Sequence, residues 1–367
     1  MKKSFVFAFL CVLALALVVS CAEPEAEVKS YTVTFDSNGG SEVAAVVVKE
    51  GEKVSKPENP TKDGCVFGAW QLDGKDFDFS SVITADTKLV ASWIEIKHVK
   101  NLSEIKTVDG KTASFGFGSS SNEAVVIDGK GLYVVDEWQD LWVSHNVTLK
   151  NIIFADGVSI HSENTEEITL TIEGCTVYAC DQVSLFEAHK DEASFRGDNS
   201  GDGLCLGIDT DTEGNARTEK TVNVVVKDST FIGANDPESD RDGYKDCDQY
   251  KASNKNKSRG HGVSLGNQAG KTDCLKSAVI ENCVFTGLKG HAVQLFKIDS
   301  PITIKNNKFE SYGVNKQTIA GEKQDYAVRG DMRTKGSSVV LTFSGNTYEK
   351  SDYTVNISDY TYTGESK

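Results

Sequence analysis

A dense acidic segment offers the most specific metal-binding chemistry in this sequence. Residues 236–248 carry carboxylates on alternating positions, one of them followed directly by glycine. Calcium takes about six to eight oxygen ligands, and loops of this pattern can supply them around a sharp turn. The candidate ligands are Glu238, Asp240, Asp242 and Asp246. The match is loose, because Gln249 stands where such loops place a bidentate Glu. The alternative is a solvated acidic insertion.

A second group of side chains could perform acid–base chemistry. The basic residues Arg329 and Lys297 lie near Asp299 and Asp331 in segments that share a strand pattern. Within that pattern, Ser264 and Gln294 hold the position of Arg329. Arginine is normally fully protonated, so its use as a base would require an unusual, crowded environment. The alternative is the polar exterior of a repeat protein.

Aromatic side chains could bind a ligand by stacking, because their faces are apolar and flat. The candidates are Trp138, Trp142 and Phe296. The histidines are scattered without metal-ligand spacing, but His261 and His291 take the same position in two repeats. We expect these two rings to stack as a structural pair.

The first 20 residues predict export. Lys2 and Lys3 precede an apolar run from Phe5 to Val19, which is too short for a spanning helix and is typical of a signal peptide. The end of this run, VVSC, resembles the lipobox of bacterial lipoproteins, which implies cleavage before Cys21 and acylation of its thiol. More than one acyl chain anchors a protein stably. A two-membrane cell would carry it on the outer membrane. The alternative is an ordinary signal peptide.

The charge balance limits the partners. The chain of 367 residues has a formal net charge of −15, and removal of Lys2 and Lys3 makes it more negative. This sign argues against nucleic acid and anionic membrane surfaces as partners. None of the nine cysteines forms a CxxC pair, so no zinc site is predicted and no disulfide is assigned.

A repeated eight-residue pattern decides the fold of the C-terminal two-thirds. The segments are VTLKNIIF, LTIEGCTV, VVVKDSTF, AVIENCVF, ITIKNNKF and LTFSGNTY, and they start at residues 147, 170, 224, 278, 302 and 341. Positions one and three are apolar, which predicts strands. Position five holds Asn151, Gly174, Asp228, Asn282, Asn306 and Gly345. These residue types tolerate the left-handed backbone, so we expect a structural ladder at one corner.

The spacing of the segments indicates a solenoid. The intervals are 23, 54, 54, 24 and 39 residues, and the short ones fit one turn of a stacked coil. The longer intervals fit either two turns with insertions or one turn with a long loop. A second strand follows in several repeats: GVSI, GVSL, AVQL and AVRG. Its valines should point inward, and Ser159, Ser264, Gln294 and Arg329 outward.

These features together resemble the right-handed parallel β-helix of pectate-lyase-like proteins. The resemblance covers residues 122–367 and concerns the architecture rather than one enzyme family. It implies that a lyase on an acidic polysaccharide would use Arg329 or Lys297 as base. Calcium would then neutralise the uronate carboxylate, and Asp299 or Asp331 would belong to the same site.

Residues 31–93 form a separate module. The segments VTFDSNGG, PTKDGCVFGAWQLDG and FDFSSVITADTKLVASW resemble the internalin-type B repeat, also called the Listeria–Bacteroides repeat. The resemblance implies a β-grasp-like unit of a surface or secreted protein. Trp70 and Trp93 should be core residues. Cys65 replaces the usual aromatic residue, and Gly68-Ala69 replaces the usual step before Trp70.

The sequence therefore predicts an exported, all-β, lipid-anchored envelope protein. Its expected parts are a signal peptide (1–20), a lipidated tether (21–30), the B repeat (31–93), a linker and entry cap (94–121) and the β-helix (122–367). The favoured function is non-catalytic binding of glycans or of another envelope or host component. The alternatives are a calcium-assisted polysaccharide lyase and a structural or adhesion component, because fold alone does not decide function.

Overall fold

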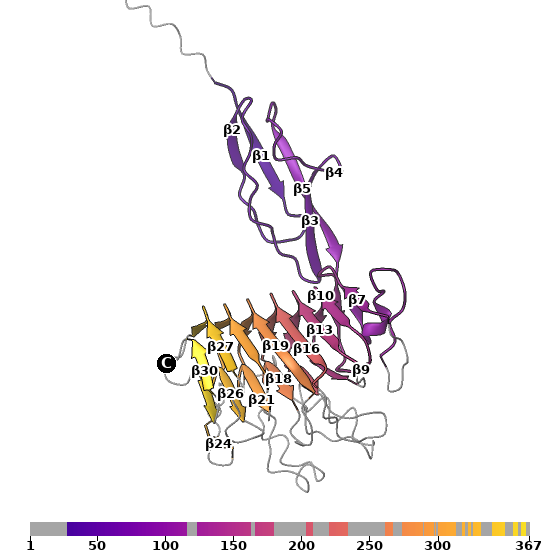
Figure 1. Ribbon diagram of the computed structural model, residues 1–367. Helices are drawn as coiled ribbons and strands as arrows, with labels where there is room; N and C mark the ends of the chain where they lie inside the picture. The colour runs from indigo at the N-terminus through magenta and orange to yellow at the C-terminus, as the bar shows by residue number, and fades with distance from the viewer. Residues whose placement is uncertain are drawn as a thin grey trace, which may run out of the picture. The chain divides into compact units, whose positions relative to one another are not determined.

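The computed structural model gives a nearly all-β chain in two compact units, up to Trp93 and from Ile94 onward (Figure 1). It describes residues 28–115, 123–162, 166–179, 203–207, 220–233, 261–266, 274–288, 290–296, 298, 300–312, 318–319, 322–323, 326–331, 340–348, 355–358 and 361–364.

The first unit is a five-stranded sheet in the order β2-β1-β5-β3-β4. Its strands are β1 (Ser30–Asp36), β2 (Val46–Lys49), β3 (Cys65–Leu72), β4 (Lys75–Asp76) and β5 (Thr87–Glu95). The β1–β5 pair is parallel and β2 runs antiparallel to β1. Trp70 is 1% exposed and lies in the core with Phe35. The Trp93 indole donates a hydrogen bond to Ser37 O at 2.9 Å and packs on Gly40, where a Cβ would overlap the ring.

The second unit is a parallel β-helix, as the repeats predict. Its three faces are named sheets 1, 2 and 3 in the order in which one turn of the chain visits them. Sheet 1 contains β7 (Val125–Asp128), β10 (Val147–Lys150), β13 (Ile168–Glu173), β16 (Val222–Lys227), β19 (Leu275–Glu281), β22 (Ile302–Lys305), β27 (Val340–Ser344) and β30 (Thr361–Gly364). Neighbouring strands in this sheet are parallel and follow one another in chain order.

Sheets 2 and 3 repeat this order. Sheet 2 contains β6 (Lys97–Val99), β8 (Tyr133–Val135), β11 (Ile153–Phe154), β14 (Thr176–Tyr178), β17 (Thr230–Ile232), β20 (Val284–Thr286), β23 (Lys308–Phe309) and β28 (Thr347–Tyr348). Sheet 3 contains β9 (Gln139–Val143), β12 (Val158–Ser162), β15 (Leu204–Gly207), β18 (Val263–Gly266), β21 (Val293–Phe296), β26 (Val328–Asp331) and β29 (Val355–Ser358). A short hairpin, β24 (Thr318–Ile319) and β25 (Glu322–Lys323), and a 3-10 turn, η1 (Leu102–Glu104), complete the described elements.

The long intervals between repeats are single turns with long loops. Strand β16 pairs directly with β13 and with β19, although 54 residues separate each pair. Along the chain, the additional residues fall between strands of sheets 2 and 3 or of sheets 3 and 1, for example between Tyr178 and Leu204. By contrast, two residues join sheet 1 to sheet 2 in every turn from β10–β11 to β27–β28. The coil therefore varies at the borders of sheet 3 and is constant at the opposite corner.

The constant corner depends on the left-handed residue at position five. Asn151, Asp228, Asn282 and Asn306 have φ of 51°, 52°, 55° and 55°. Gly174 and Gly345 have φ of 63° and 64°. Such values suit asparagine, aspartate and glycine far better than other residues. On the outer side, Asn282 Nδ2 donates to Asp228 Oδ1 at 3.1 Å.

A buried polar ladder at the same corner lies one residue further on, at position six. Asn307 Nδ2 donates to Ile280 O at 3.0 Å, and Asn346 Nδ2 donates to Ile304 O at 2.9 Å. In the turns where cysteine holds this position, Ser229 and Asn307 accept the backbone N–H of Cys175 and Cys283. These bonds satisfy backbone groups that the turn would otherwise bury without partners.

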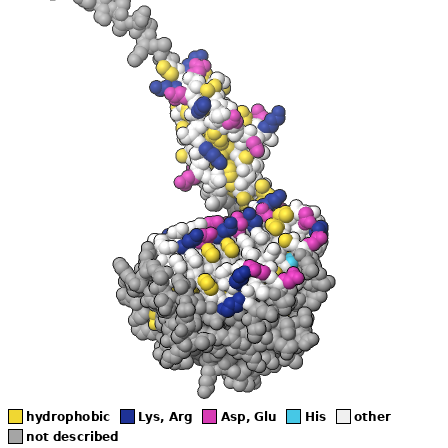
Figure 2. Space-filling model, in the orientation of Figure 1, with side chains coloured by type: hydrophobic (Ala, Val, Ile, Leu, Met, Phe, Trp, Pro, Cys, Tyr) yellow, Lys and Arg dark blue, Asp and Glu magenta, His cyan; other side chains and the backbone are white. Residues whose placement is uncertain are grey.

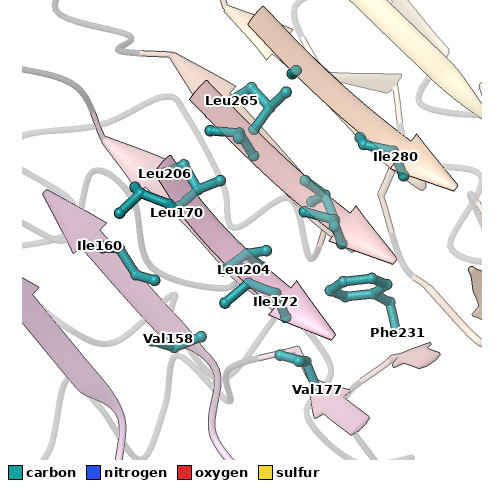
Figure 3. Packing of buried hydrophobic residues seen from close by; sticks show 14 of the residues in the cluster. Val158, Ile160, Leu170, Ile172, Val177, Leu204, Leu206, Phe231, Leu265 and Ile280 are labelled. Carbon is teal, nitrogen blue, oxygen red and sulfur yellow. The ribbon is translucent and has the colours of Figure 1, made fainter. Parts of the chain in front are cut away.

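The core consists of inward side chains stacked from turn to turn (Figure 3). Strands of sheet 1 alternate buried and half-buried residues, and β13 and β16 do so along their whole length. On sheet 2 the rings of Phe231, Phe285, Phe309 and Tyr348 stack with centroids 5.0, 5.0 and 5.1 Å apart. On sheet 3, Val158, Val263, Val293 and Val328 are 0% exposed. Each turn thus buries its apolar side chains against its neighbours.

The described part of the expected linker and entry cap, residues 94–115, contributes directly to this unit. Strand β6 pairs with β8 in sheet 2, and Leu102, Ile105 and Ala113 are buried in the β-helix core. Glu104 accepts the backbone N–H of Asn101 at 2.8 Å, which fixes the short η1 turn. Strand β7, which the repeat pattern did not reveal, forms the next turn and pairs with β10.

Candidate functional site

The outer face of sheet 3 brings the polar residues of successive turns into one row. The strand register places Asp140, Ser159, Cys205, Ser264, Gln294 and Arg329 side by side in this order. Ser159, Ser264 and Gln294 are at most 2% exposed, although they point away from the core. Asp140 is exposed and Arg329 is half-buried. Ligand access to the described part of the row is therefore greatest at its two ends.

Four side chains cluster at the β9–β12 end of the row. Strands β9 and β12 pair in parallel, so Asp140 lies opposite Ser159 and Trp142 opposite His161. His161 Nε2 lies 2.9 Å from Asp140 Oδ1 and 2.9 Å from Ser159 Oγ. The indole of Trp142 stacks on the imidazole, with centroids 4.5 Å apart and planes at 16°. A half-exposed indole thus lies beside a carboxylate, a hydroxyl and an imidazole.

The cluster does not have the geometry of a nucleophilic triad. A triad needs the serine at one imidazole nitrogen and the carboxylate at the other, so that the ring can accept a proton from one side while it is held from the other. Here both oxygens approach Nε2. An Nε2–H group that donates to Asp140 cannot also take the proton of Ser159. The arrangement fixes a polar, aromatic surface and does not activate the hydroxyl.

The other end of the row contains part of the proposed lyase group. Arg329 lies in β26 opposite Gln294 of β21, and Asp331 lies opposite Phe296. The side chains of Asp331 and Phe296 are outside the described part of the structure, as are Lys297 and Asp299 entirely. The structure therefore places Arg329 on the outer face and gives the strand register but no side-chain geometry for Asp331, while Lys297 and Asp299 lie outside the described residues.

The calcium hypothesis falls outside the described residues. Glu238, Asp240, Asp242 and Asp246 all belong to the stretch 234–260, which the structure does not describe. Within the described ranges, no group of three or more His, Cys, Asp or Glu side chains could hold a metal ion. The calcium and lyase hypotheses thus remain predictions from the sequence.

The stacking candidates occupy different places. Trp142 belongs to the cluster on β9 and β12, whereas Trp138 is a half-buried residue in the bend that leads into β9. His261 and His291 form a stacked pair with centroids 4.9 Å apart, and both are 0% exposed. His261 Nδ1 accepts the backbone N–H of His291 at 2.8 Å. That pair has a structural role at the corner before sheet 3.

The sequence did not reveal the partners of Trp142. Asp140 and His161 are 21 positions apart, and the two strands align only when Gln139 is matched with Val158. Gln139 points inward and is 5% exposed, and its side chain accepts the backbone N–H of Leu102 at 3.0 Å. Because Gln139 is polar and occupies an inward position, the alternation of apolar residues did not reveal this turn. The usable signal was the match of DLW with SIH around Leu141 and Ile160.

A surface groove of about 550 Å³ lies at the sheet 1–sheet 2 corner of the first turns. Its lining is Asp128, Lys130, Gly131, Asn151, Ile152, Ile153, Gly174 and Thr176. Asp128 Oδ1 accepts bonds from Asn151 Nδ2 at 2.9 Å and from the Lys130 backbone at 2.8 Å. Burial raises the pKa of Asp128, but these two bonds and the positive charges of Lys150 and Lys130 together hold the pKa below its usual 3.8. Through its Oδ1 atom, Asp128 therefore helps to shape the corner.

Comparison with known proteins identifies one domain and two relatives. Residues 31–92 match the model of the Listeria-Bacteroides repeat domain, as the sequence predicts. A protein of Evansella cellulosilytica named "Putative membrane protein" is 25% identical over 178 residues, which are 45% of this chain and 23% of that protein. A "Putative Gly-rich membrane protein" of the same organism is 37% identical over 71 residues, 18% of this chain and 8% of that protein.

The chain thus spans less than a quarter of the length of either relative. Among the described residues, no helix is long and apolar enough to cross a membrane.

Proposed function

We propose that this chain is an exported, lipid-anchored surface protein whose β-helix binds glycans on the outer face of sheet 3. The envelope setting is supported by the repeat domain at residues 31–92 and by relatives named as membrane proteins. The glycan ligand is supported chiefly by the Trp142–His161 stack beside Asp140.

The anchor is assigned to Cys21. It follows Ser20 at the end of the apolar leader and precedes a short polar stretch. Acylation at one residue with more than one chain holds a protein to a bilayer without any spanning helix. In cells fed a labelled fatty acid, the chain should carry label, and Cys21→Ser should abolish it. Label that persists in the Cys21→Ser chain would rule out this anchor.

Glycan recognition follows from the chemistry of the cluster. Sugars present apolar C–H faces that stack on aromatic rings, and hydroxyls that pair with carboxylates and imidazoles. Trp142 offers the ring, and its orientation is fixed because its neighbour His161 is itself held by Asp140. A fixed ring loses little conformational entropy on binding.

The experiment measures retention of the full chain on immobilised neutral and uronate-containing glycans. Trp142→Ala should weaken binding of any retained glycan at least tenfold, which corresponds to about 1.4 kcal/mol. Asp140→Asn should weaken it less, because the amide oxygen can still accept a hydrogen bond from His161 Nε2 but carries no negative charge.

The matched control is a second His–Asp pair on a different face. His98 Nδ1 lies 2.8 Å from Asp136 Oδ1 on the outer side of sheet 2. His98→Ala and Asp136→Asn should leave retention unchanged. Binding that survives Trp142→Ala, or that falls equally in the control variants, would refute a site on sheet 3. The absence of retention on every glycan would refute the ligand class.

A further inference from the structure

The outer face of sheet 1 carries a row of charges that alternate in sign from turn to turn, named here the charge ladder. The register aligns Asp128, Lys150, Glu173, Lys227, Glu281 and Lys305 at the same position of six adjacent strands. Figure 2 shows such a line of alternating basic and acidic side chains across the visible face. Three positive and three negative groups make the ladder neutral in a chain with a net charge of −15.

The ladder is formed and partly exposed. Lys150 Nζ lies 3.1 Å from Glu173 Oε1, and Lys227 Nζ lies 3.3 Å from Glu173 Oε2. Lys305 Nζ lies 2.6 Å from Glu281 Oε2. These side chains remain 23–39% exposed. These five charges therefore keep room for a further partner of opposite sign above the sheet.

A row of β-branched residues runs beside the ladder. Val126, Thr148, Thr171, Val225, Val279 and Thr303 lie side by side, and all are half-buried. Branching at Cβ restricts the side-chain rotamers, so these residues lose little entropy when another surface covers them. The result is a flat, stiff strip next to fixed charges. Sheets with such surfaces pack face to face about 10 Å apart.

We propose that this face binds a second copy of the same chain about a two-fold axis. The axis runs parallel to the strands, between β13 and β16, so that the two coils run in opposite directions. Each strand position then faces the same position on the partner, and the order of the turns is reversed. Glu173 faces the partner's Lys227, Lys150 faces the partner's Glu281, and Asp128 faces the partner's Lys305. In the neighbouring row, Thr171 faces the partner's Val225.

Charge alternation selects this arrangement. A two-fold axis along the coil would place each charge opposite its own copy, and like charges repel. An isologous dimer requires a self-complementary patch, and the ladder is self-complementary only when reversed. The carboxylates between the lysines would repel a polyanion, and the lysines would repel a polycation. A second ladder of the same alternating sequence satisfies both signs.

The expected dimer is weak. Six turns at about 4.8 Å extend roughly 25 Å, and four residues of strand extend about 13 Å. The contact therefore covers a few hundred Å² per partner, at or below the low end of specific interfaces. Affinity in the micromolar range or weaker is expected in solution.

Two single charge reversals at the axis test the proposal. Glu173→Lys places two lysines opposite two lysines, and Lys227→Glu places two glutamates opposite two glutamates. Sedimentation of the full chain in mild detergent should show concentration-dependent dimers for the unaltered chain. Each single variant should dimerise at least tenfold more weakly.

Two combinations should restore association. An equimolar mixture of the Glu173→Lys and Lys227→Glu chains should form mixed dimers, and the double variant in one chain should dimerise again. Lys308→Glu on sheet 2, which loses its ion pair with Glu310, is the control and should have no effect. Circular dichroism confirms that each variant is folded.

A chain that stays monomeric at every accessible concentration would overturn the proposal. The same holds if the single variants associate like the unaltered chain, or if the mixture and the double variant fail to recover. The recovery on mixing separates a lost contact from a damaged fold, because a damaged fold is not repaired by a second damaged chain.

Discussion

Two buried thiols, Cys175 and Cys283, lie at the corner between sheets 1 and 2, and each is 1% exposed. Burial raises the pKa of Cys175 to about 11 and that of Cys283 to about 12, although backbone hydrogen bonds act in the opposite direction. Cys283 Sγ donates to Glu281 O at 3.2 Å. Both groups are thus held as neutral thiols that fill space.

These pKa values predict a loss of stability in alkali. In the unfolded chain the thiols ionise near pH 9, whereas in the folded chain they stay protonated to about pH 11 or above. Their contribution is therefore complete below pH 9 and falls as the pH rises toward 11, by up to about 1.4 kcal/mol per pH unit for each thiol.

Urea unfolding at a series of pH values measures this slope. Cys283→Ala should reduce it, whereas Cys65→Ala, in the first unit, should leave the slope of the β-helix transition unchanged. An identical slope in the Cys283→Ala chain would show that other groups cause it.

At the scale of single elements, the aromatic stack of sheet 2 joins four turns through one line of rings. Phe285 lies between Phe231 and Phe309, with both centroids 5.0 Å away. It is 0% exposed, so truncation leaves a cavity that rigid neighbours cannot fill.

Phe285→Ala should lower the free energy of unfolding by about 3–5 kcal/mol. Val284 precedes it on the same strand but is only half-buried. Val284→Ala should cost about 1 kcal/mol or less. Denaturant unfolding of both variants distinguishes a turn-to-turn stack from general strand propensity. Equal losses of unfolding free energy in the two variants would show that the stacked rings add no stability of their own.

Two glycines with positive φ at the corner between sheets 1 and 2, Gly174 and Gly131, should differ in their tolerance of a side chain. At Gly174, φ is 63° and a Cβ would lie 2.5 Å from Asn151 Oδ1. At Gly131, φ is 70° but no atom lies within 4 Å of the added carbon. Gly131→Ala should therefore cost about 1–2 kcal/mol for the backbone alone. Gly174→Ala should cost more, because Asn151 must also move. Unfolding experiments in which the two costs are equal would contradict a tight corner.

Sequence patterns predicted the strands and corners of the β-helix wherever the backbone preference of a residue agrees with the burial of its side chain. Position five was readable because Asn, Asp and Gly all fit one backbone conformation. The turn at β7 was not readable, because its left-handed residues are Lys130 and Gly131, beyond the usual position. The buried ladder at position six was missed because Cys, Ser and Asn share no obvious pattern. In the site, Gln139 masked the alignment of β9 with β12.

At the scale of the whole molecule, two separate hydrophobic cores predict two unfolding events. The first unit packs around Trp70 and Leu89, and the β-helix core shares no residue with it. Units with independent cores unfold as independent cooperative systems unless their interface is large.

Calorimetry of the full chain should therefore show two transitions. Trp70→Ala should lower the melting temperature of one and leave the other in place, because it removes a 1%-exposed side chain from the first core only. Phe285→Ala should have the converse effect. A single transition that both substitutions shift together would mean that the units unfold as one.

The two-residue connection between sheets 1 and 2 has a consequence for how such a chain could evolve. From β10 onward the connections of variable length are the ones that border sheet 3, so a segment there can grow or shrink while sheets 1 and 2 remain in phase. Related chains could therefore differ in the segments that border sheet 3, while the strands of sheets 1 and 2 keep the same register.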